Sequence, residues 1–132
     1  MFRRLAYVSR PRENLPLVEI PRIIAVCRAH NEAHGITGVL LFTGIDFAQL
    51  IEGPIDVMGA LWSRIRADTR HHGIVAFLDE SSPSRWYQDW RMGFPSDAGL
   101  VDTIAGWHEK PPKTDGGGDA ELRRVLAACD PL

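Results

Sequence analysis

Cysteine is scarce in this sequence. Only Cys27 and Cys129 occur among the 132 residues, and they lie far apart in the chain. Two distant cysteines give neither the CxxC spacing of a thiolate metal site nor the dense pattern of a disulfide-stabilised secreted domain. We therefore expect a protein of the cytoplasm, without structural disulfides.

An excess of charge of one sign is also lacking. The formal net charge is −2 and the isoelectric point is near 6.2, so the composition has no basic character of the kind that binds nucleic acids or anionic membranes. Long apolar runs are missing as well, and no segment reaches the length of a transmembrane helix or a signal peptide. We expect neither a membrane nor a nucleic acid as a partner.

Motifs for phosphate and metal are absent too. The sequence has no GxGxxG or P-loop pattern, and the segment SRPRENLP has no glycine for the anion loop of acylphosphatase-like catalysis. His30 and His34 have the i, i+4 spacing of two zinc ligands on a helix. The order H-N-E-A-H, however, differs from HExxH and points Glu32 to another side of the helix. We expect no metal site.

What is present is an ordered series of strand and helix signals. Apolar and β-branched runs predict strands at residues 5–9, on both sides of the turn at 43–46, and at 74–78 after a polar TRHHG turn. The aromatic segment 86–94 is a candidate fifth strand. Helices are predicted at about 21–34, ended by Gly35, and from Gly53-Pro54 to about Asp68.

This order, β-α-β-β-α-β plus one strand, is that of an α+β ferredoxin-like sandwich. We expect a five-stranded mixed sheet with two helices on one face. After Pro95 the composition predicts a helix at 98–107, the linker KPPKTDGGG, and a last helix AELRRVLAA capped by Asp119. The predicted organisation is thus a domain at 1–95 and a helical extension at 96–132 that packs on the open sheet face.

Helical periodicity places an amide on the packed face of the first helix. Counting from Ile23, residues Cys27, Asn31 and His34 follow at i+4, i+8 and i+11. Asn31 alone has an ordinary alternative, a frayed helix end. If it is buried, an amide without partners costs about 1–3 kcal/mol, so something should meet it.

Strand alternation adds two more polar side chains to the same layer. Gln49 alternates with Phe47 and Ile51, and Tyr7 lies on the face of the first strand that carries Leu5. Gln49 alone could face solvent if the two faces are reversed, and Tyr7 alone could be an edge aromatic. Three polar side chains from separate elements, converging between the sheet and the helices, indicate a ligand.

Several segments together resemble one family. LAYVS, AHNEAHGITGVLLF, FAQLIEGP, RADTRHHG and DWRMGF, in this order, are similar to the BLUF family of flavin-binding blue-light sensors, over residues about 2–95. The chain looks like the short, stand-alone type of the family. The resemblance implies FAD as the cofactor, with FMN or riboflavin as alternatives.

The resemblance also implies residue roles. The photoactive residues would be Tyr7, Gln49, Trp90 and Met92. The flavin-binding residues would be Tyr7, Ile23, His30, Asn31, Phe47, Gln49, Arg64, Ile65, Asp68, Arg70, His71 and Met92. In such proteins light moves an electron and then a proton from the tyrosine to the flavin. The glutamine rotates or tautomerises, and the absorbance shifts to the red.

The output would follow from a change near Trp90 and Met92, and which of the two faces the flavin in the dark is open. By resemblance we expect a sensor and not an enzyme, a homo-oligomer, and a downstream protein that the sequence does not identify. Two alternatives remain: a cofactor-free ferredoxin-like interaction module, and a flavin-dependent enzyme. A colourless purified protein would favour the first alternative, and substrate consumption the second.

Overall fold

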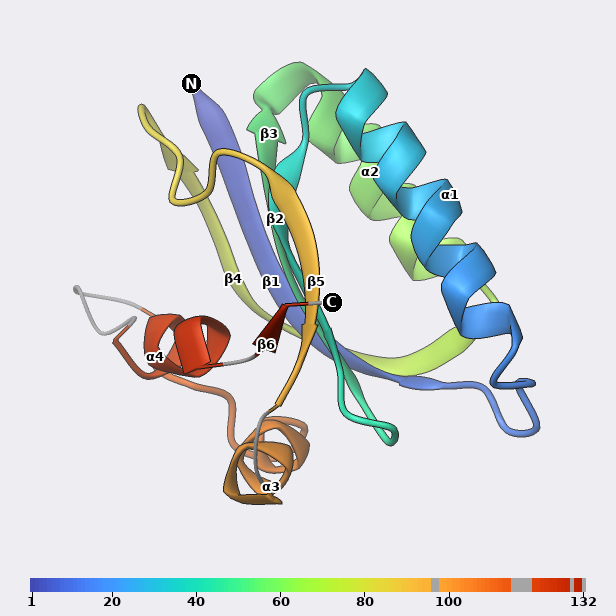
Figure 1. Ribbon diagram of the computed structural model, residues 1–132. Coiled ribbons are helices and arrows are strands. Elements are labelled where there is room, and N and C mark those ends of the chain that lie inside the picture. Colours follow the sequence, from blue (N-terminus) through green and yellow to red (C-terminus); the bar gives the residue numbers. More distant parts are fainter. Residues whose placement is uncertain (96–97, 115–119, 129, 132) are drawn as a thin grey trace.

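The computed structural model describes residues 1–95, 98–114, 120–128 and 130–131 (Figure 1). Its elements are the strands β1 (Phe2–Pro11), β2 (Thr37–Phe42), β3 (Phe47–Pro54), β4 (His71–Ser82), β5 (Trp90–Phe94) and β6 (Asp130–Pro131), and the helices α1 (Glu19–Ala33), α2 (Ile55–Ala67), α3 (Ala98–Gly106) and α4 (Ala120–Ala128). The predicted order of strands and helices is confirmed.

The strands form one mixed sheet in the order β4-β1-β3-β2-β5-β6. All neighbouring pairs are antiparallel except β2 and β5, which are parallel. Helices α1 and α2 cover one face, and α3 and α4 lie on the opposite face (Figure 1). The predicted five-stranded mixed sheet is confirmed, and the two-residue β6 is an addition that the sequence pattern did not indicate.

Two strands, β1 and β4, extend at both ends beyond the predicted ranges 5–9 and 74–78. β1 reaches Pro11 and β4 begins at His71, because these two residues pair with each other at the end of the β1–β4 ladder. The polar TRHHG segment, expected to be a turn, therefore supplies the first residues of β4. Backbone pairing with a neighbouring strand stabilises this polar stretch, which strand propensity alone disfavours.

α1 ends at Ala33, and the predicted terminating residue Gly35 has the positive φ of 67° that glycine tolerates best. The other predicted cap, Asp119 before α4, cannot be described in this way. Asp119 and part of the predicted linker lie outside the described residues.

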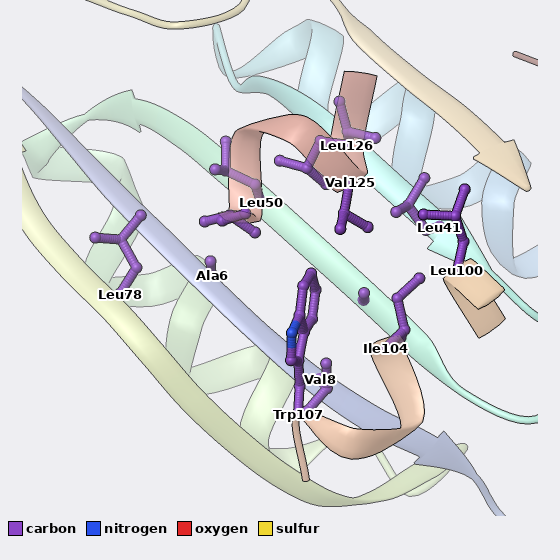
Figure 2. Packing of buried hydrophobic residues seen from close by; sticks show 13 residues of the cluster. Ala6, Val8, Leu41, Leu50, Leu78, Leu100, Ile104, Trp107, Val125 and Leu126 are labelled. Carbon is purple, nitrogen blue, oxygen red and sulfur yellow. The ribbon is translucent and has the colours of Figure 1, made fainter. Parts of the chain in front are cut away.

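Strand alternation gives the sheet two apolar faces. On β3, Phe47 and Ile51 pack toward α1 and α2, whereas Ala48 and Leu50 belong to a cluster on the other face. In that second cluster, Trp107 and Ile104 of the α3 region and Val125 of α4 lie over the sheet residues (Figure 2). Helices on both faces are needed because each fully buried apolar side chain contributes about 1.5–3 kcal/mol.

A buried carboxylate fixes the loop that leads into β5. Glu52 of β3 is fully buried and accepts hydrogen bonds from Arg4 Nε at 3.0 Å and from the backbone N–H groups of Trp86 and Tyr87 at 3.0 and 2.5 Å. Because Glu52 lies three positions after Gln49 on the same strand, this loop and the centre of β3 are held together.

Among the helices that the structure describes, none has the length and apolar character to cross a bilayer.

Candidate functional site

A cavity lies between the sheet and the helices α1 and α2. It contains about 620 Å³ of space free of protein atoms, part of it open to solvent. Its lining residues are Tyr7, Ile23, Cys27, Asn31, Leu40, Phe47, Gln49, Leu61, Ile65, Asp68, Arg70 and His71. Nine of the twelve flavin-binding residues implied by the resemblance are in this set.

Tyr7 and Gln49 form the polar centre of the cavity wall. They are directly opposite each other in the β1–β3 register, and the Tyr7 hydroxyl donates to Gln49 Oε1 at 2.5 Å. Both side chains are buried, with 5% and 7% exposure. The amide nitrogen of Gln49 has no hydrogen-bond partner among the described residues, so this donor is available to a ligand.

Burial decides the protonation state of Tyr7. Removal of the phenol from water raises the pKa of Tyr7 well above its ordinary value, and Cys27 and Asp68 raise this pKa further. The hydroxyl is therefore protonated over the physiological pH range. Tyr7 enters any reaction as a neutral phenol with its proton directed at Gln49.

Asn31 supplies a second amide, from the last turn of α1. It is buried with 3% exposure, and its backbone carbonyl accepts hydrogen bonds from His34 and Ile36 as the helix ends. Its side-chain oxygen has only a long contact, 3.5 Å to Nδ1 of His30. The amide is therefore available to a ligand in the cavity.

The predicted inward face of α1 is confirmed up to Asn31 and wrong at its last position. Ile23, Cys27 and Asn31 line the cavity, but His34 is exposed. The helix ends at Ala33, and the backbone of His34 is no longer helical, with φ −112° and ψ 11°. The helical period therefore does not extend to His34.

Charged residues surround the edge of the cavity beyond α2. Arg70 makes two hydrogen bonds to Asp68 through Nε and a third through Nη2, and these bonds hold the pKa of Asp68 below its ordinary value. His30 and Arg64 lie in an adjoining hollow between α1 and α2, which shares Asp68 and Arg70 with the cavity. Cations here suit an anionic or acceptor-rich group.

His71 is held in one tautomer by two neighbours. Its Nε2 lies 2.7 Å from the carbonyl oxygen of Ile65, which can only accept, so Nε2 carries the proton in the neutral ring. Its Nδ1 then accepts from the Ser9 hydroxyl at 2.7 Å. The ring centroid lies 6.2 Å from that of Tyr7, so His71 forms part of the wall beside the phenol.

Trp90 and Met92 lie one strand away from the cavity. As alternation predicts, both project to the same side of β5, where they are buried in one cluster with Leu40 and Phe47. Leu40 separates them from Gln49, because it pairs with Gln49 on one side and with Met92 on the other. Neither side chain lines the cavity, and the buried Nε1 of Trp90 lacks a hydrogen-bond partner among the described residues.

The cavity also includes residues that the sequence analysis did not assign to it. Leu40 and Leu61 line the walls, and so does Cys27, which we had placed on the packed face only. The available signal was periodicity: Leu40 alternates within β2, and Leu61 lies four positions before Ile65 on α2. Periodicity identifies a packed face, but it does not distinguish a packed face from a cavity wall.

The residues present fit a flat heterocycle with two chemically different kinds of surface. Aliphatic side chains such as Ile23 and Ile65 offer apolar contact, and the free amides of Gln49 and Asn31 offer hydrogen bonds to polar edges. An isoalloxazine ring has this combination of apolar faces and polar edges.

Within the described ranges, no group of three or more His, Cys, Asp or Glu side chains has the geometry to hold a metal ion.

Comparisons with known proteins agree with this site. A family model described as BLUF, sensors of blue-light using FAD, matches residues 2–93. The blue light- and temperature-regulated antirepressor BluF of Escherichia coli (strain K12) is 34% identical over 85 residues, 64% of this chain and 21% of that protein. The photoactivated adenylate cyclase subunit beta of Euglena gracilis is 33% identical over 95 residues, 68% of this chain and 11% of that protein.

Solved structures share the fold over nearly the whole chain. BlrB, a BLUF protein in its dark state, has 35% identity and a TM-score of 0.73, and the match covers 96% of each chain. BlsA in its ground state has 25% identity and a TM-score of 0.77, covering 100% of this chain and 91% of that one. The chain spans about a fifth of the antirepressor and a tenth of the cyclase subunit. With the family model matching most of its length, the chain belongs to the BLUF family of blue-light sensors that bind flavin.

Proposed function

We propose that this chain is a blue-light photoreceptor that holds FAD without a covalent bond, and that it signals to a separate protein without catalytic turnover. The observation that carries the proposal is the Tyr7–Gln49 hydrogen bond beside a free amide nitrogen at the cavity wall. Ile23 and Ile65 would contact the faces of the flavin ring. Asn31 would bond its polar edge, and Arg64 and Arg70 would lie near the phosphate arm.

Bound flavin supplies a light-activated one-electron oxidant. The chain supplies the donor, because Tyr7 is a buried phenol and its hydroxyl bonds to Gln49. Loss of an electron makes the Tyr7 hydroxyl strongly acidic, so its proton moves along the bond toward Gln49 Oε1. When the amide of Gln49 then rotates or tautomerises, it presents an altered donor and acceptor pattern to the cavity.

A light-minus-dark absorbance spectrum of the purified protein tests this function. We expect a reversible red shift in the native protein, retained flavin but no red shift in Gln49→Leu, and loss of the reversible response in Tyr7→Phe. Ile45→Ala, in the exposed β2–β3 turn, is the matched control and should behave as the native protein does. A normal red shift in Gln49→Leu would contradict the proposed role of the amide.

The same preparation distinguishes the alternatives. A cofactor-free interaction module would be colourless, and a flavin-dependent enzyme would consume a substrate during its spectral cycle. Chromatography of the flavin released on denaturation tells FAD from FMN and riboflavin. Arg64 and Arg70 next to the cavity suit the phosphate that FAD and FMN share and riboflavin lacks, and we expect FAD because the family is described as using it.

The route of output that we propose runs through the sheet to its second face. α3 and α4 share a buried cluster with β1, β2 and β3. A structural change at the centre of β3 would therefore alter the packing of these helices. Helices α3 and α4 would then present an altered surface to a downstream protein or to a second copy of the chain in the cytoplasm. Light-dependent elution in size-exclusion chromatography would show a change in self-association.

A further inference from the structure

Tyr7 has a second aromatic neighbour besides His71. The ring of Trp62 on α2 lies 5.5 Å from the Tyr7 ring between centroids, at an interplanar angle of 48°. Trp62 packs at the edge of the cluster of Leu5 and Ile51 and does not line the cavity. It lines instead a separate groove between the end of α2 and the start of β4. Tyr7 therefore lines the cavity and also packs against Trp62, which does not line it.

Two reactions can follow the oxidation of Tyr7, loss of its proton and gain of a replacement electron, and each involves a different neighbour. The proton of Tyr7 leaves along the hydrogen bond to Gln49. An electron that replaces the lost one has to come from a neighbouring group that is easily oxidised. Indole and phenol are the side chains best suited to one-electron oxidation at neutral pH, and electron transfer between adjacent rings is fast because its rate falls steeply with distance.

A cation beside Trp62 opposes that transfer. The guanidinium of Arg66 lies 5.6 Å from the Trp62 ring centroid, within the distance at which a cation interacts with an aromatic face. The same positive charge makes removal of an electron from the indole less favourable. Arg66 therefore favours a hole that stays on Tyr7.

We propose that Trp62 is a secondary electron donor to oxidised Tyr7, restrained by Arg66; the inference rests on the proposed photoreceptor function. Tyr7 first loses one electron to the photoexcited flavin. Before Tyr7 loses its proton, one electron moves from Trp62 to Tyr7 and restores the neutral phenol. The indole cation then loses its N–H proton to water in the groove, and the resulting indolyl radical adds dioxygen to form a peroxyl radical. The electron that the flavin took up and one proton from water convert this peroxyl radical to a hydroperoxide, so the flavin returns to its oxidised state.

Peptide mass spectrometry after prolonged illumination in air provides the test, with dark samples as the baseline. Each preparation is first matched for bound flavin by absorbance. We expect oxygenated indole at Trp62 to accumulate several-fold above its dark level, and Tyr7→Phe to abolish this accumulation. Arg66→Gln should increase it several-fold, whereas the exposed Arg22→Gln on α1 should leave it unchanged.

Trp86 is an internal control for diffusible oxidants. It is also half-buried, and it lies near α4, on the sheet face opposite Tyr7, with Arg4 4.0 Å from its ring centroid. Its oxygenation should not depend on Tyr7.

Electron paramagnetic resonance of samples frozen under light gives a second readout. We expect the signal of an indole radical, and Trp62→Phe should remove it.

Three outcomes would overturn the inference. Oxygenation of Trp62 that persists in Tyr7→Phe would show that the hole does not pass through the phenol. A reversible red shift without any oxygenation or radical at Trp62 would reject this route and leave the photoreceptor function standing. A protein without flavin or red shift would reject both.

Discussion

At the scale of single residues, the cavity is marked by buried amides without protein partners. Gln49 and Asn31 are both buried, and their side chains leave donors unsatisfied among the described residues. Both amides face the partly open cavity, and neither is among the fully enclosed side-chain atoms that lack a partner in the described part of the chain. A flavin that bonds these groups binds only the folded chain, so flavin binding and protein stability are coupled.

Substitution of Asn31 should therefore change flavin binding and ligand-free stability differently. We expect Asn31→Ala to weaken flavin binding by about 1–3 kcal/mol, or up to roughly a hundredfold in Kd. The thermal midpoint of the flavin-free protein should change little, because without a ligand the Asn31 side chain has only the 3.5 Å contact to His30. Fluorescence titration and calorimetry measure the two effects. Arg22→Ala, at an exposed position of α1, should change neither, and a large loss of flavin-free stability in Asn31→Ala would contradict this account.

Acid should weaken the protein through Asp68. The Arg70 hydrogen bonds lower the pKa of Asp68 in the folded state, so its contribution is present above the ordinary value of 3.8 and is lost as pH falls through the folded value. We expect the thermal midpoint of the flavin-free protein to fall more steeply below about pH 4 than that of Asp68→Asn. Arg70→Gln should flatten the profile in the same way. An unchanged slope in both variants would rule out this linkage.

Periodicity predicted which residues face the cavity, and its failures have physical causes. Alternation and the helical repeat placed Tyr7, Gln49 and Asn31 correctly on inward faces, because apolar neighbours fix those faces. It was wrong for His34, where the helix had already ended. The hydrogen bond between His71 and Ser9 joins two strands that are distant in sequence, and no local pattern contains that information.

At the scale of elements, close approach between strands explains one glycine. A Cβ on Gly38 of β2 would lie 2.0 Å from the carbonyl oxygen of Leu50 on β3, and its φ of 144° is unfavourable for other residues. The order of elements was predictable because turn and breaker signals separate them. The extents of β1 and β4 were not, since each depends on pairing with the other.

Two glycine substitutions should therefore change the free energy of unfolding in opposite directions. We expect Gly38→Ala to destabilise the protein by about 2 kcal/mol or more, because the backbone of two strands has to separate. Gly59→Ala in α2 has open space around its Cβ and should stabilise by about 0.5–1 kcal/mol. Urea unfolding of both variants measures the difference. Equal effects would show that strand contact does not constrain Gly38.

At the scale of the whole molecule, the sheet is covered by helices on both faces, and the two layers differ in packing. The face under α3 and α4 is a continuous apolar cluster around Trp107, whose ring lies 5.6 Å from that of Phe77 (Figure 2). The face under α1 and α2 contains the cavity. Stability thus depends heavily on the second layer, whereas ligand chemistry belongs to the first.

Truncation of the buried tryptophan should separate these two properties. We expect Trp107→Ala to lower the free energy of unfolding by about 3–5 kcal/mol, as large-to-small core substitutions with aromatic residues do. Flavin affinity of the remaining folded protein should change little, because Trp107 does not contact the cavity residues. Chemical unfolding and flavin titration at low temperature measure both. Leu17→Ala, at an exposed position, is the control and should lie within about 0.5 kcal/mol of the native protein.

The spacing of Trp90 and Met92 restricts how β5 can move. Since they are two residues apart on a strand that is parallel to β2, placing one at the position of the other beside Leu40 requires a shift of two residues, about 6.6 Å. A shift of one residue would turn Arg91 toward the buried side instead. Any sliding of β5 is therefore restricted to whole two-residue increments, and an increment of that size must also displace the loop bonded to Glu52 and the start of α3.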